Sequence, residues 1–467
     1  EKQGVPLVAL KAGGTEESAE LAQSHSGTLA VDNEIWSALF SRLAIVEVGS
    51  PKALIEALKL LGSPKPPKGN RIVAAANSGG YAAMIGEKGR DVGLDFPAPT
   101  KAQRNALRKT VPELVSLMNP LDWNLPWAAM STPDTSDNGM GLLMDDRCDL
   151  LVYFVDWPRE LDVADVWWPT LEGLIQLNNR MDCPVFVASV FPDGLPADLR
   201  LRLADAGIIT LQGLDDALSA FSAAACYPVL RAQVLADSES RFLPVPDCSA
   251  APVNTLDEAK GKALLAKHGV SIPAHVTGTA EEIISAADRL GYPLAVKLLN
   301  ANLPHKTHAS AVHLNLNCKA GVKQAITAIQ ASVYQYDACL DTNHFLMERM
   351  VVTPRAEFIA GVSHKLGIGY ALVIGRGGTD VEELKDFTTL LLPTSSAQIQ
   401  QALQSLRITR RLQLQETDVA ALTQTIYNIA LFTDHMRNKL VELDVNPILL
   451  DASGDVTAVD AYLRIRD

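Results

Sequence analysis

The sequence has few cysteines, and none of them has the paired spacing of a metal site. Its six cysteines are scattered through 467 residues, and no Cys-x-x-Cys motif occurs. This scarcity argues against a disulfide framework and a structural zinc site, and it indicates reduced thiols in a cytoplasmic protein. The cysteines are Cys148, Cys183, Cys226, Cys248, Cys318 and Cys339.

Positive charge and long apolar runs are also lacking. The chain has 41 lysine and arginine residues against 54 aspartate and glutamate residues, which gives a formal net charge of −13. Sequence-independent binding of nucleic acid needs a basic surface, so we expect no nucleic-acid partner. No apolar run approaches the roughly 18 residues of a membrane span, so we expect no membrane partner. Anionic ligands must then be held locally, by backbone amides and a few basic side chains.

What the sequence does contain is a large apolar fraction in alternating strand and helix patterns. Hydrophobic residues make up 48% of the chain, and its length allows about three domains. As far as residue 236, short apolar runs alternate with helical stretches, which is the pattern of a parallel α/β sheet. The expected strands lie within 5–12, 44–50, the start of 71–94, 148–157, 183–191 and 206–211.

The pattern changes after a connector at 237–254. Charges recur within the apolar runs that follow, which favours an antiparallel sheet with one face turned to a ligand. A helix is expected over 255–272, behind a threonine cap at Thr255. Together with a Pro/Gly/Lys linker at 62–70, these changes divide the chain. The apolar runs are 293–300, 311–316, 344–351 and 357–363, and the segments are 1–64, 71–236 and 254–467.

The first segment is too small to form a complete domain. Its two expected strands and one helix, at about 32–42, cannot close a doubly wound sheet. Either more chain precedes Glu1, or this segment completes a sheet that is supplied elsewhere.

One histidine stands in unusual surroundings. His25 lies in the stretch Ser-His-Ser-Gly-Thr-Leu-Ala at 24–30, and no cysteine or second histidine is near it in the sequence. Such an imidazole can be an ordinary loop residue, a proton shuttle, or a nucleophile with room for an incoming group. These three alternatives are open on the residues alone.

Two stretches could hold phosphate. Ser78-Gly79-Gly80 separates an apolar strand from a helix. Glycines allow a tight turn, and a helix N-terminus offers free N–H groups and a partial positive charge. Lys297 lies inside the apolar run 293–300, where an unpaired ammonium group is costly. A phosphate partner and an edge-strand lysine that reaches out to solvent are both open.

Acidic residues gather towards the end of the chain. Glu348 and Glu357 lie in or beside expected strands. The last strands predict a hairpin with Asp444 and Asn446 on one side and Asp460 on the other. Oxygen ligands from neighbouring strands suit Mg²⁺, which takes few protein ligands and completes its shell with phosphate and water. A solvated hairpin is the alternative.

The order of these motifs resembles one family. SHSGTLA, NSGGYAAM, NPLDW, VKLLNANLPHKT, GRGGTDVEELKD and ELDVNPILL follow one another as in the NDP-forming acyl-CoA synthetases, relatives of succinyl-CoA synthetase. The resemblance covers essentially the whole chain. It implies flavodoxin-like, doubly wound CoA-ligase domains followed by an ATP-grasp domain. It also implies a ligase that uses Mg²⁺, ATP, CoA and a carboxylic acid.

The resemblance further implies roles for single residues. His25 matches the histidine that ATP phosphorylates and that passes the phosphoryl group to a carboxylate, and CoA then attacks the acyl phosphate. His305 matches a second histidine that relays phosphate towards the first. The glycine turn would begin a helix that faces the phosphohistidine. The other matches are Ser78, Gly79 and Gly80 at the phosphate, Lys297, Glu348 and Glu357 at the nucleotide, and Asn446 and Asp460 at Mg²⁺.

Two departures accompany the resemblance. The loop after Lys297 reads HKTHASAV where the family usually has HKSDVGGV, so His308 replaces an aspartate. The family also begins with a CoA-binding domain, and no GxGxxG fingerprint for CoA occurs here. We therefore expect thioester formation to need residues N-terminal to Glu1.

Three functions are open. The first is the acid–CoA ligase, for which we expect a homo-oligomer and an aromatic, hydroxycinnamic acid as substrate. The second is an ATP-grasp carboxylate–amine ligase, against which the first 230 residues count. The third is a non-catalytic relative that binds nucleotide or acyl-CoA. The aromatic expectation rests on five tryptophans in the middle segment, which can equally be core residues: Trp123, Trp127, Trp157, Trp167 and Trp168.

Overall fold

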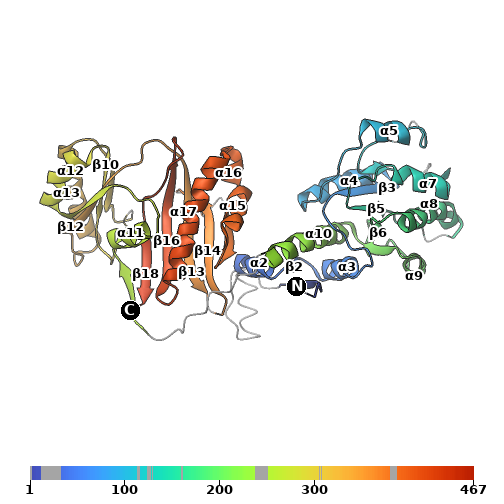
Figure 1. Ribbon diagram of the computed structural model, residues 1–467, viewed down its shortest axis with the longest axis horizontal. Helices are drawn as coiled ribbons and strands as arrows, with labels where there is room; N and C mark the ends of the chain where they lie inside the picture. The colour runs from blue at the N-terminus through green and yellow to red at the C-terminus, as the bar shows by residue number, and fades with distance from the viewer. Residues whose placement is uncertain are drawn as a thin grey trace. The chain divides into compact units, whose positions relative to one another are not determined.

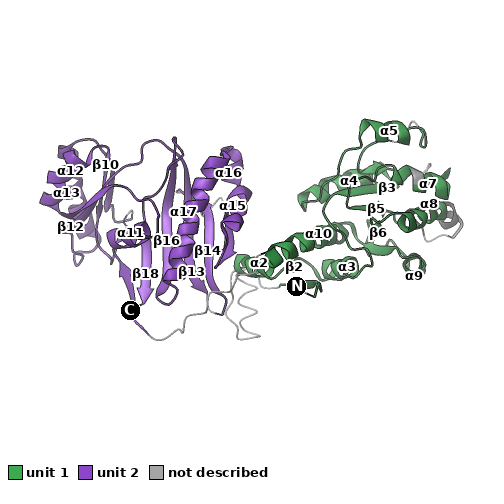
Figure 2. Ribbon diagram, viewed as in Figure 1, with its two compact units in different colours: residues 1–238 green, residues 239–467 purple. Residues whose placement is uncertain are grey.

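The computed structural model forms two compact units, residues 1–238 and 239–467 (Figures 1 and 2). The predicted catalytic residues His25 and His305 lie outside the residues that the structure describes, as do Trp127 and Cys248. The described residues are 3–11, 33–112, 116–123, 128, 130–158, 161–236, 251–303, 306, 308–365, 367–378 and 386–466.

Unit 1 is built on a parallel sheet of five strands in the order β4-β3-β5-β6-β7. This is the flavodoxin-like order, in which the first strand of the sheet lies between the second and the third. It confirms the predicted doubly wound α/β fold. The strands are β3 (Ile72–Ala76), β4 (Leu121–Asp122), β5 (Leu150–Phe154), β6 (Val185–Ser189) and β7 (Ile209–Gln212).

Helices cover both faces of this sheet. Alternate residues of β3 and β5 belong to two different hydrophobic clusters, so each strand is buried on both sides. Helices α3 (Pro51–Leu61), α4 (Gly79–Asp91) and α10 (Leu214–Ala236) supply one cluster. The other is supplied by α5 (Lys101–Leu107), α7 (Pro133–Gly141), α8 (Leu161–Arg180) and α9 (Ala197–Asp205).

The N-terminal segment adds a separate two-stranded parallel sheet. It consists of β1 (Leu7–Leu10) and β2 (Ile45–Val48), with α2 (Asn33–Arg42) before β2, as the sequence predicts. The pattern analysis missed α3, although Ser50 caps it and a proline follows at the first helical position. Val46 and Val48 share a hydrophobic cluster with α3 and α10. The domain boundary at residue 64 stays a prediction.

Helix α10 is long and apolar enough, by length and composition alone, to cross a membrane. Much of it packs in unit 1, where Leu218, Phe221 and Ala224 are buried. Core helices pass the same test, so α10 is weak evidence for a membrane span.

Unit 2 contains two antiparallel sheets, as the spacing of charges predicts. The larger follows the path β15-β14-β13-β16-β18-β8, with β17 paired to β16, and the smaller has the order β11-β10-β12-β9. The larger sheet comprises β8 (Val253–Leu256), β13 (Pro354–Lys365), β14 (Gly369–Arg376), β15 (Phe387–Leu391), β16 (Leu440–Asp451), β17 (Val456–Ala458) and β18 (Tyr462–Arg466). The smaller comprises β9 (His275–Thr279), β10 (Leu294–Leu298), β11 (Val312–Leu316) and β12 (His344–Arg349).

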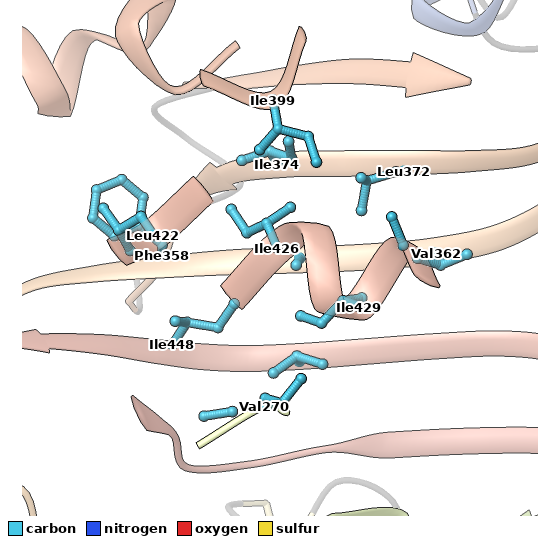
Figure 3. Close-up of a cluster of buried hydrophobic side chains, with 14 of the residues drawn as sticks. Val270, Phe358, Val362, Leu372, Ile374, Ile399, Leu422, Ile426, Ile429 and Ile448 are labelled. Carbon is cyan, nitrogen blue, oxygen red and sulfur yellow. The ribbon is translucent and has the colours of Figure 1, made fainter. Parts of the chain in front are cut away.

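Helices cover one face of each sheet in unit 2. In Figure 3, Phe358 of β13, Ile426 of α17 and Ile448 of β16 lie in the cluster on the larger sheet. On the smaller sheet, Val296 of β10 packs against α12 and α13. Side chains alternate along a strand, so Lys297 points away from those helices. The helices are α12 (Ala280–Leu290), α13 (Lys319–Tyr336), α15 (Ser396–Ser405), α16 (Arg407–Arg411) and α17 (Glu416–His435).

The first helix of unit 2 is α11 (Glu258–Lys267). The predicted threonine cap is wrong, because Thr255 belongs to β8. Asp257 is the cap instead, and its side chain accepts a hydrogen bond from the Lys260 N–H. The short loop from β8 therefore sets the first turn of α11, where Glu258 lies.

Candidate functional site

Five charged side chains form one largely buried network in unit 2. Lys297 Nζ lies 2.5 Å from Glu258 Oε1 and 3.1 Å from Glu348 Oε2. Lys262 Nζ lies 2.6 Å from Glu348 Oε1 and 2.7 Å from Glu258 Oε1. Lys306 Nζ lies 3.0 Å from Glu258 Oε2. We call these five residues the lysine–glutamate network.

The backbone brings these side chains together from three elements and a loop. Glu258 and Lys262 lie four residues apart on α11, and so on one face of the helix. In the β10–β12 ladder, Ala295 lies opposite Glu348. Glu348 and Lys297 therefore share a face of the smaller sheet as diagonal neighbours, within reach of long side chains.

The charges of the network stabilise one another. Burial opposes the charged form of Lys297, but the carboxylates around it outweigh burial and raise its pKa above the usual range. Burial likewise opposes ionisation of Glu258, but the three neighbouring lysines hold the pKa of that carboxyl well below its usual range. The buried charges are thus paired, as buried charges must be.

The network reaches the larger sheet through one backbone carbonyl. Lys262 Nζ and Lys297 Nζ donate hydrogen bonds to the carbonyl oxygen of Val459, at 2.6 Å and 2.7 Å. The next residue is Asp460, whose Oδ2 lies 3.8 Å from Lys297 Nζ. The side chain of Asp460 is 35% exposed, so one end of the network is open to solvent.

Asp460 lies between β17 and β18, which together form the second arm of the predicted hairpin. Ladder pairs lie on both sides of it. Between them the Val459 N–H donates a 3.1 Å hydrogen bond to the Pro447 carbonyl oxygen, which brings the backbone next to Asn446 against the backbone next to Asp460. The flanking pairs are Asp444 with Tyr462 and Ile448 with Ala458.

The residues at this point fit Mg²⁺. Burial and the negative charges of Asp460 and Glu442 raise the pKa of Asp444 to about 6. Burial also raises the pKa of Asp460. A divalent cation would relieve this crowding, and carboxylate and amide oxygens are its preferred ligands. The described part of the chain has no group of three or more His, Cys, Asp or Glu residues that could hold a metal. Phosphate and water would therefore complete the shell.

Glu357 lies apart from these contacts, in β13 beside the glycine-rich turn after β14. The Gly377 N–H donates a 2.8 Å hydrogen bond to the Glu357 carbonyl oxygen. Unit 2 thus brings Lys297, Glu348 and Asp460 together and places Glu357 at this turn.

In unit 1 the predicted phosphate site lies at the start of α4. Ser78 is the N-cap, Gly79 and Gly80 are exposed, and the first turn contains no acidic residue. This end of α4 follows β3. The strand order reverses between β3 and β5, and ligands bind at such a topological switch point in parallel sheets. The turn therefore has the form of an anion site.

The described tryptophans of the middle segment belong to one hydrophobic cluster or pack against it: Trp157, Trp167 and Trp168 are partly buried against the cluster that contains Trp123. Trp123 is fully buried, so the core interpretation is confirmed for this residue. Trp157 lies three residues after the end of β5, is partly exposed, and packs edge-to-face on Trp167 at 6.2 Å between ring centroids.

Two protein families match the chain. The ATP-grasp domain family matches residues 247–465, and the succinyl-CoA ligase like flavodoxin domain family matches residues 1–61. A trans-feruloyl-CoA synthase from an unidentified prokaryote is 25% identical over 469 residues, which is 99% of this chain and 65% of that protein. An ADP-forming 4-hydroxybutyrate–CoA ligase from Nitrosopumilus maritimus is 22% identical over 96% of this chain and 64% of its own length. The chain therefore combines an ATP-grasp domain with a succinyl-CoA ligase-like segment, and over almost its whole length it is similar to ADP-forming acyl-CoA synthetases.

The chain spans about two thirds of the length of these two synthetases. A third relative is the beta subunit of the ADP-forming acetate–CoA ligase II of Pyrococcus furiosus. It is 25% identical over 215 residues, which cover 45% of this chain and 91% of that subunit.

Sequence reasoning missed two members of the network, Glu258 and Lys262, and it expected Lys306 as a loop residue near a triphosphate. Sequence reasoning also left open that Lys297 lies on an edge strand. This alternative is wrong, because β10 lies between β11 and β12. In the structure the partners of Lys297 are the carboxylates of Glu258 and Glu348. The four-residue spacing of Glu258 and Lys262 could have indicated an ion pair on one helix face, but the same spacing also fits an exposed pair.

Proposed function

We propose that this protein acts in ADP-forming acyl-CoA synthesis, in which a carboxylic acid, CoA and ATP give acyl-CoA, ADP and phosphate. The observation that carries the proposal is the joining of a succinyl-CoA ligase-like segment and an ATP-grasp unit in one chain. The relatives with this arrangement are CoA ligases. A carboxylate–amine ligase would need only the ATP-grasp unit.

The proposed chemistry proceeds by four displacements. An imidazole nitrogen of His305 attacks the γ-phosphorus of ATP, and ADP leaves. An imidazole nitrogen of His25 attacks this phosphoryl group, and the His305 imidazole is released. A carboxylate oxygen of the acid attacks the phosphohistidine, which returns the imidazole and gives an acyl phosphate. The CoA thiolate attacks the acyl carbon, and inorganic phosphate leaves. A neutral imidazole is a competent nucleophile near pH 7, so this route suits a cytoplasmic enzyme.

In unit 2, Lys297, Glu348 and Glu357 are proposed to hold the nucleotide, and Asn446 and Asp460 to hold Mg²⁺. A bound Mg²⁺ would neutralise charge on the phosphates. The contacts of Lys297 with Asp460 and Glu348 support this assignment, because they place a cation and carboxylates at one point.

In unit 1, the N–H groups that begin α4 at Ser78, Gly79 and Gly80 are proposed to receive the phosphohistidine, and His305 is proposed to relay phosphate to it. We also propose three functional domains, 1–64, 71–236 and 254–467, in a cytoplasmic homo-oligomer. The proposed acid is a hydroxycinnamic acid, as the name of the trans-feruloyl-CoA synthase relative suggests, and the 4-hydroxybutyrate–CoA ligase relative makes an aliphatic acid the alternative.

Phosphorylation of His25 tests this proposal. The chain is incubated with γ-labelled ATP and Mg²⁺, and protein-bound phosphate is tested for the acid lability and base stability of phosphohistidine. We expect labelling of the wild type and loss of the label in His25→Ala, with ATP binding retained. Equal stable labelling of His25→Ala would overturn the assignment. Nucleotide binding by the wild type without any labelling would favour the non-catalytic relative.

A further inference from the structure

Three members of the lysine–glutamate network, Glu258, Lys262 and Lys306, have no part in the proposed chemistry, and two of them lie on one helix. Glu258 and Lys262 lie on α11, and the side chain of each is only 1% exposed. Their charged groups contact Lys297, Glu348, Lys306 and the Val459 carbonyl, so they can affect ligand binding through these neighbours.

Lys262 fixes the backbone next to Asp460. Its ammonium group shares the Val459 carbonyl with Lys297, so two cations converge on one acceptor. Two like charges this close are tolerated only because carboxylates surround them, and Glu348 accepts from Lys262 through both oxygens, at 2.6 Å and 2.8 Å. The carbonyl is therefore held from two sides, and the residue that follows it is Asp460.

Glu258 fixes the lysines in the same way. Its Oε1 contacts Lys297 and Lys262, and its Oε2 contacts Lys306. One carboxylate thus ties strand β10 and the loop residue Lys306 to helix α11. Removal of this carboxylate leaves three ammonium groups with only Glu348 and the partly exposed Asp460 to balance them.

The charge balance of the network depends on Asp460. It holds three lysines and two glutamates, and Asp460 is the next negative group, at 3.8 Å from Lys297. A divalent cation on Asp460 would draw that carboxylate away from Lys297, and a positive charge would then remain on Lys297. Phosphate oxygens bound to the same cation would be attracted to the positive charge of Lys297.

We propose that Glu258 and Lys262 are positioning residues of the Mg-nucleotide site: Lys262 sets Asp460 through the Val459 carbonyl, and Glu258 holds Lys297. The inference rests on the proposed function in one respect, namely that Mg-nucleotide binds at Asp460. It adds that the buried face of helix α11, which carries Glu258 and Lys262, determines how much Mg²⁺ strengthens nucleotide binding.

The test compares ATP affinity with and without Mg²⁺, by calorimetry on the full chain well below its melting temperature. Lys262→Met keeps the length of the side chain and removes its charge, and Glu258→Gln keeps its shape. Loss of an outer-shell partner costs about 10–100-fold in metal affinity. We expect the Mg²⁺-dependent gain in ATP affinity to fall by about that factor in each variant, while affinity for metal-free ATP changes less.

Asp418→Asn is the matched control. Asp418 is a buried carboxylate of unit 2 that pairs with Arg355 and lies outside the network. It should lower the melting temperature without changing the gain from Mg²⁺. If a single variant fails to fold, the double variant Glu258→Gln/Lys262→Met removes one charge of each sign and keeps the balance.

The outcomes separate the two proposals. A folded Lys262→Met, Glu258→Gln or double variant with the wild-type gain from Mg²⁺ would overturn the positioning role alone. A wild-type chain whose ATP affinity does not respond to Mg²⁺ would instead contradict the proposed nucleotide site.

Discussion

The carboxylate of Asp122 occupies the space that a side chain at Gly79 would need. A Cβ atom added to Gly79 would lie 2.8 Å from Asp122 Oδ2, closer than real Cβ contacts allow. Gly79 begins α4, and Asp122 ends the neighbouring strand β4. A side chain at position 79 would therefore have to displace the Asp122 carboxylate at the proposed phosphate site.

Gly79→Ala and Gly80→Ala form a matched pair at this turn. At Gly80 the nearest atom to an added Cβ is Ser78 Oγ, at an ordinary 3.7 Å. We expect Gly80→Ala to be neutral or to stabilise unit 1 by up to about 1 kcal/mol, since alanine restricts the unfolded chain. Gly79→Ala should displace Asp122 and slow phosphorylation of His25.

Thermal melting and the labelling assay measure both effects. In an Asp122→Ala background the added methyl group has room, so the penalty of Gly79→Ala on melting temperature should disappear. An equal penalty in both backgrounds would contradict the close-contact explanation.

The raised pKa of Asp444 makes stability depend on pH when Mg²⁺ is absent. Its pKa is about 6 in the fold and about 3.9 in an unfolded chain. Below about pH 4 the carboxyl is protonated in both states, and there is no effect. Above pH 6 it is ionised in both, and the fold carries a penalty of about 3 kcal/mol. Stability should therefore fall between pH 4 and pH 6.

Melting temperatures of the wild type and Asp444→Asn in a chelator test this prediction. The variant should gain on the wild type as pH rises from 4 to 6, and Mg²⁺ should restore more wild-type stability at pH 7.5 than at pH 5. Asp455→Asn, in the exposed turn of the same hairpin, is the control. A constant difference between Asp444→Asn and the wild type across this range would refute the prediction.

The parts of the site that sequence reasoning finds are those with a local signal. Ser78 to Gly80 follow a strand and precede a helix, so their place was predictable from neighbouring residues. The cost of a buried Lys297 was also predictable, but its partner was not. Glu258 lies 39 residues earlier on a helix, and only the packing of α11 against the strands brings the two together.

Asp460 and Asn446 should both be needed for Mg²⁺-dependent ATP binding. Asp460→Asn removes a charged ligand, and Asn446→Ala removes the proposed amide ligand. We expect each to weaken ATP binding in Mg²⁺ by about tenfold or more, since even outer-shell losses reach this size. Calorimetry with and without Mg²⁺ measures the effect, and Asp455→Asn should leave it unchanged. An unchanged Mg²⁺ requirement in both variants would make the hairpin purely structural.

Variants of Trp157 and Trp123 test whether the tryptophans of the middle segment bind an aromatic substrate or only form core. Trp157 lies at the carboxyl end of β5, the edge of a parallel sheet where ligands bind, whereas Trp123 is fully buried. If the acid is aromatic, Trp157→Ala should raise KM for a hydroxycinnamate by about two- to tenfold, the value of one aromatic pair. KM for ATP should not change.

Trp123→Ala should instead cost about 3–5 kcal/mol of stability, because it empties part of a packed core. Steady-state kinetics with ferulate, 4-hydroxybutyrate and acetate, together with melting curves, distinguish the two variants. The longest protein available should be used, since this chain covers 65% of the feruloyl-CoA synthase relative. Equal KM changes for ferulate and acetate in Trp157→Ala would count against aromatic stacking, because a small aliphatic acid offers no ring to stack on.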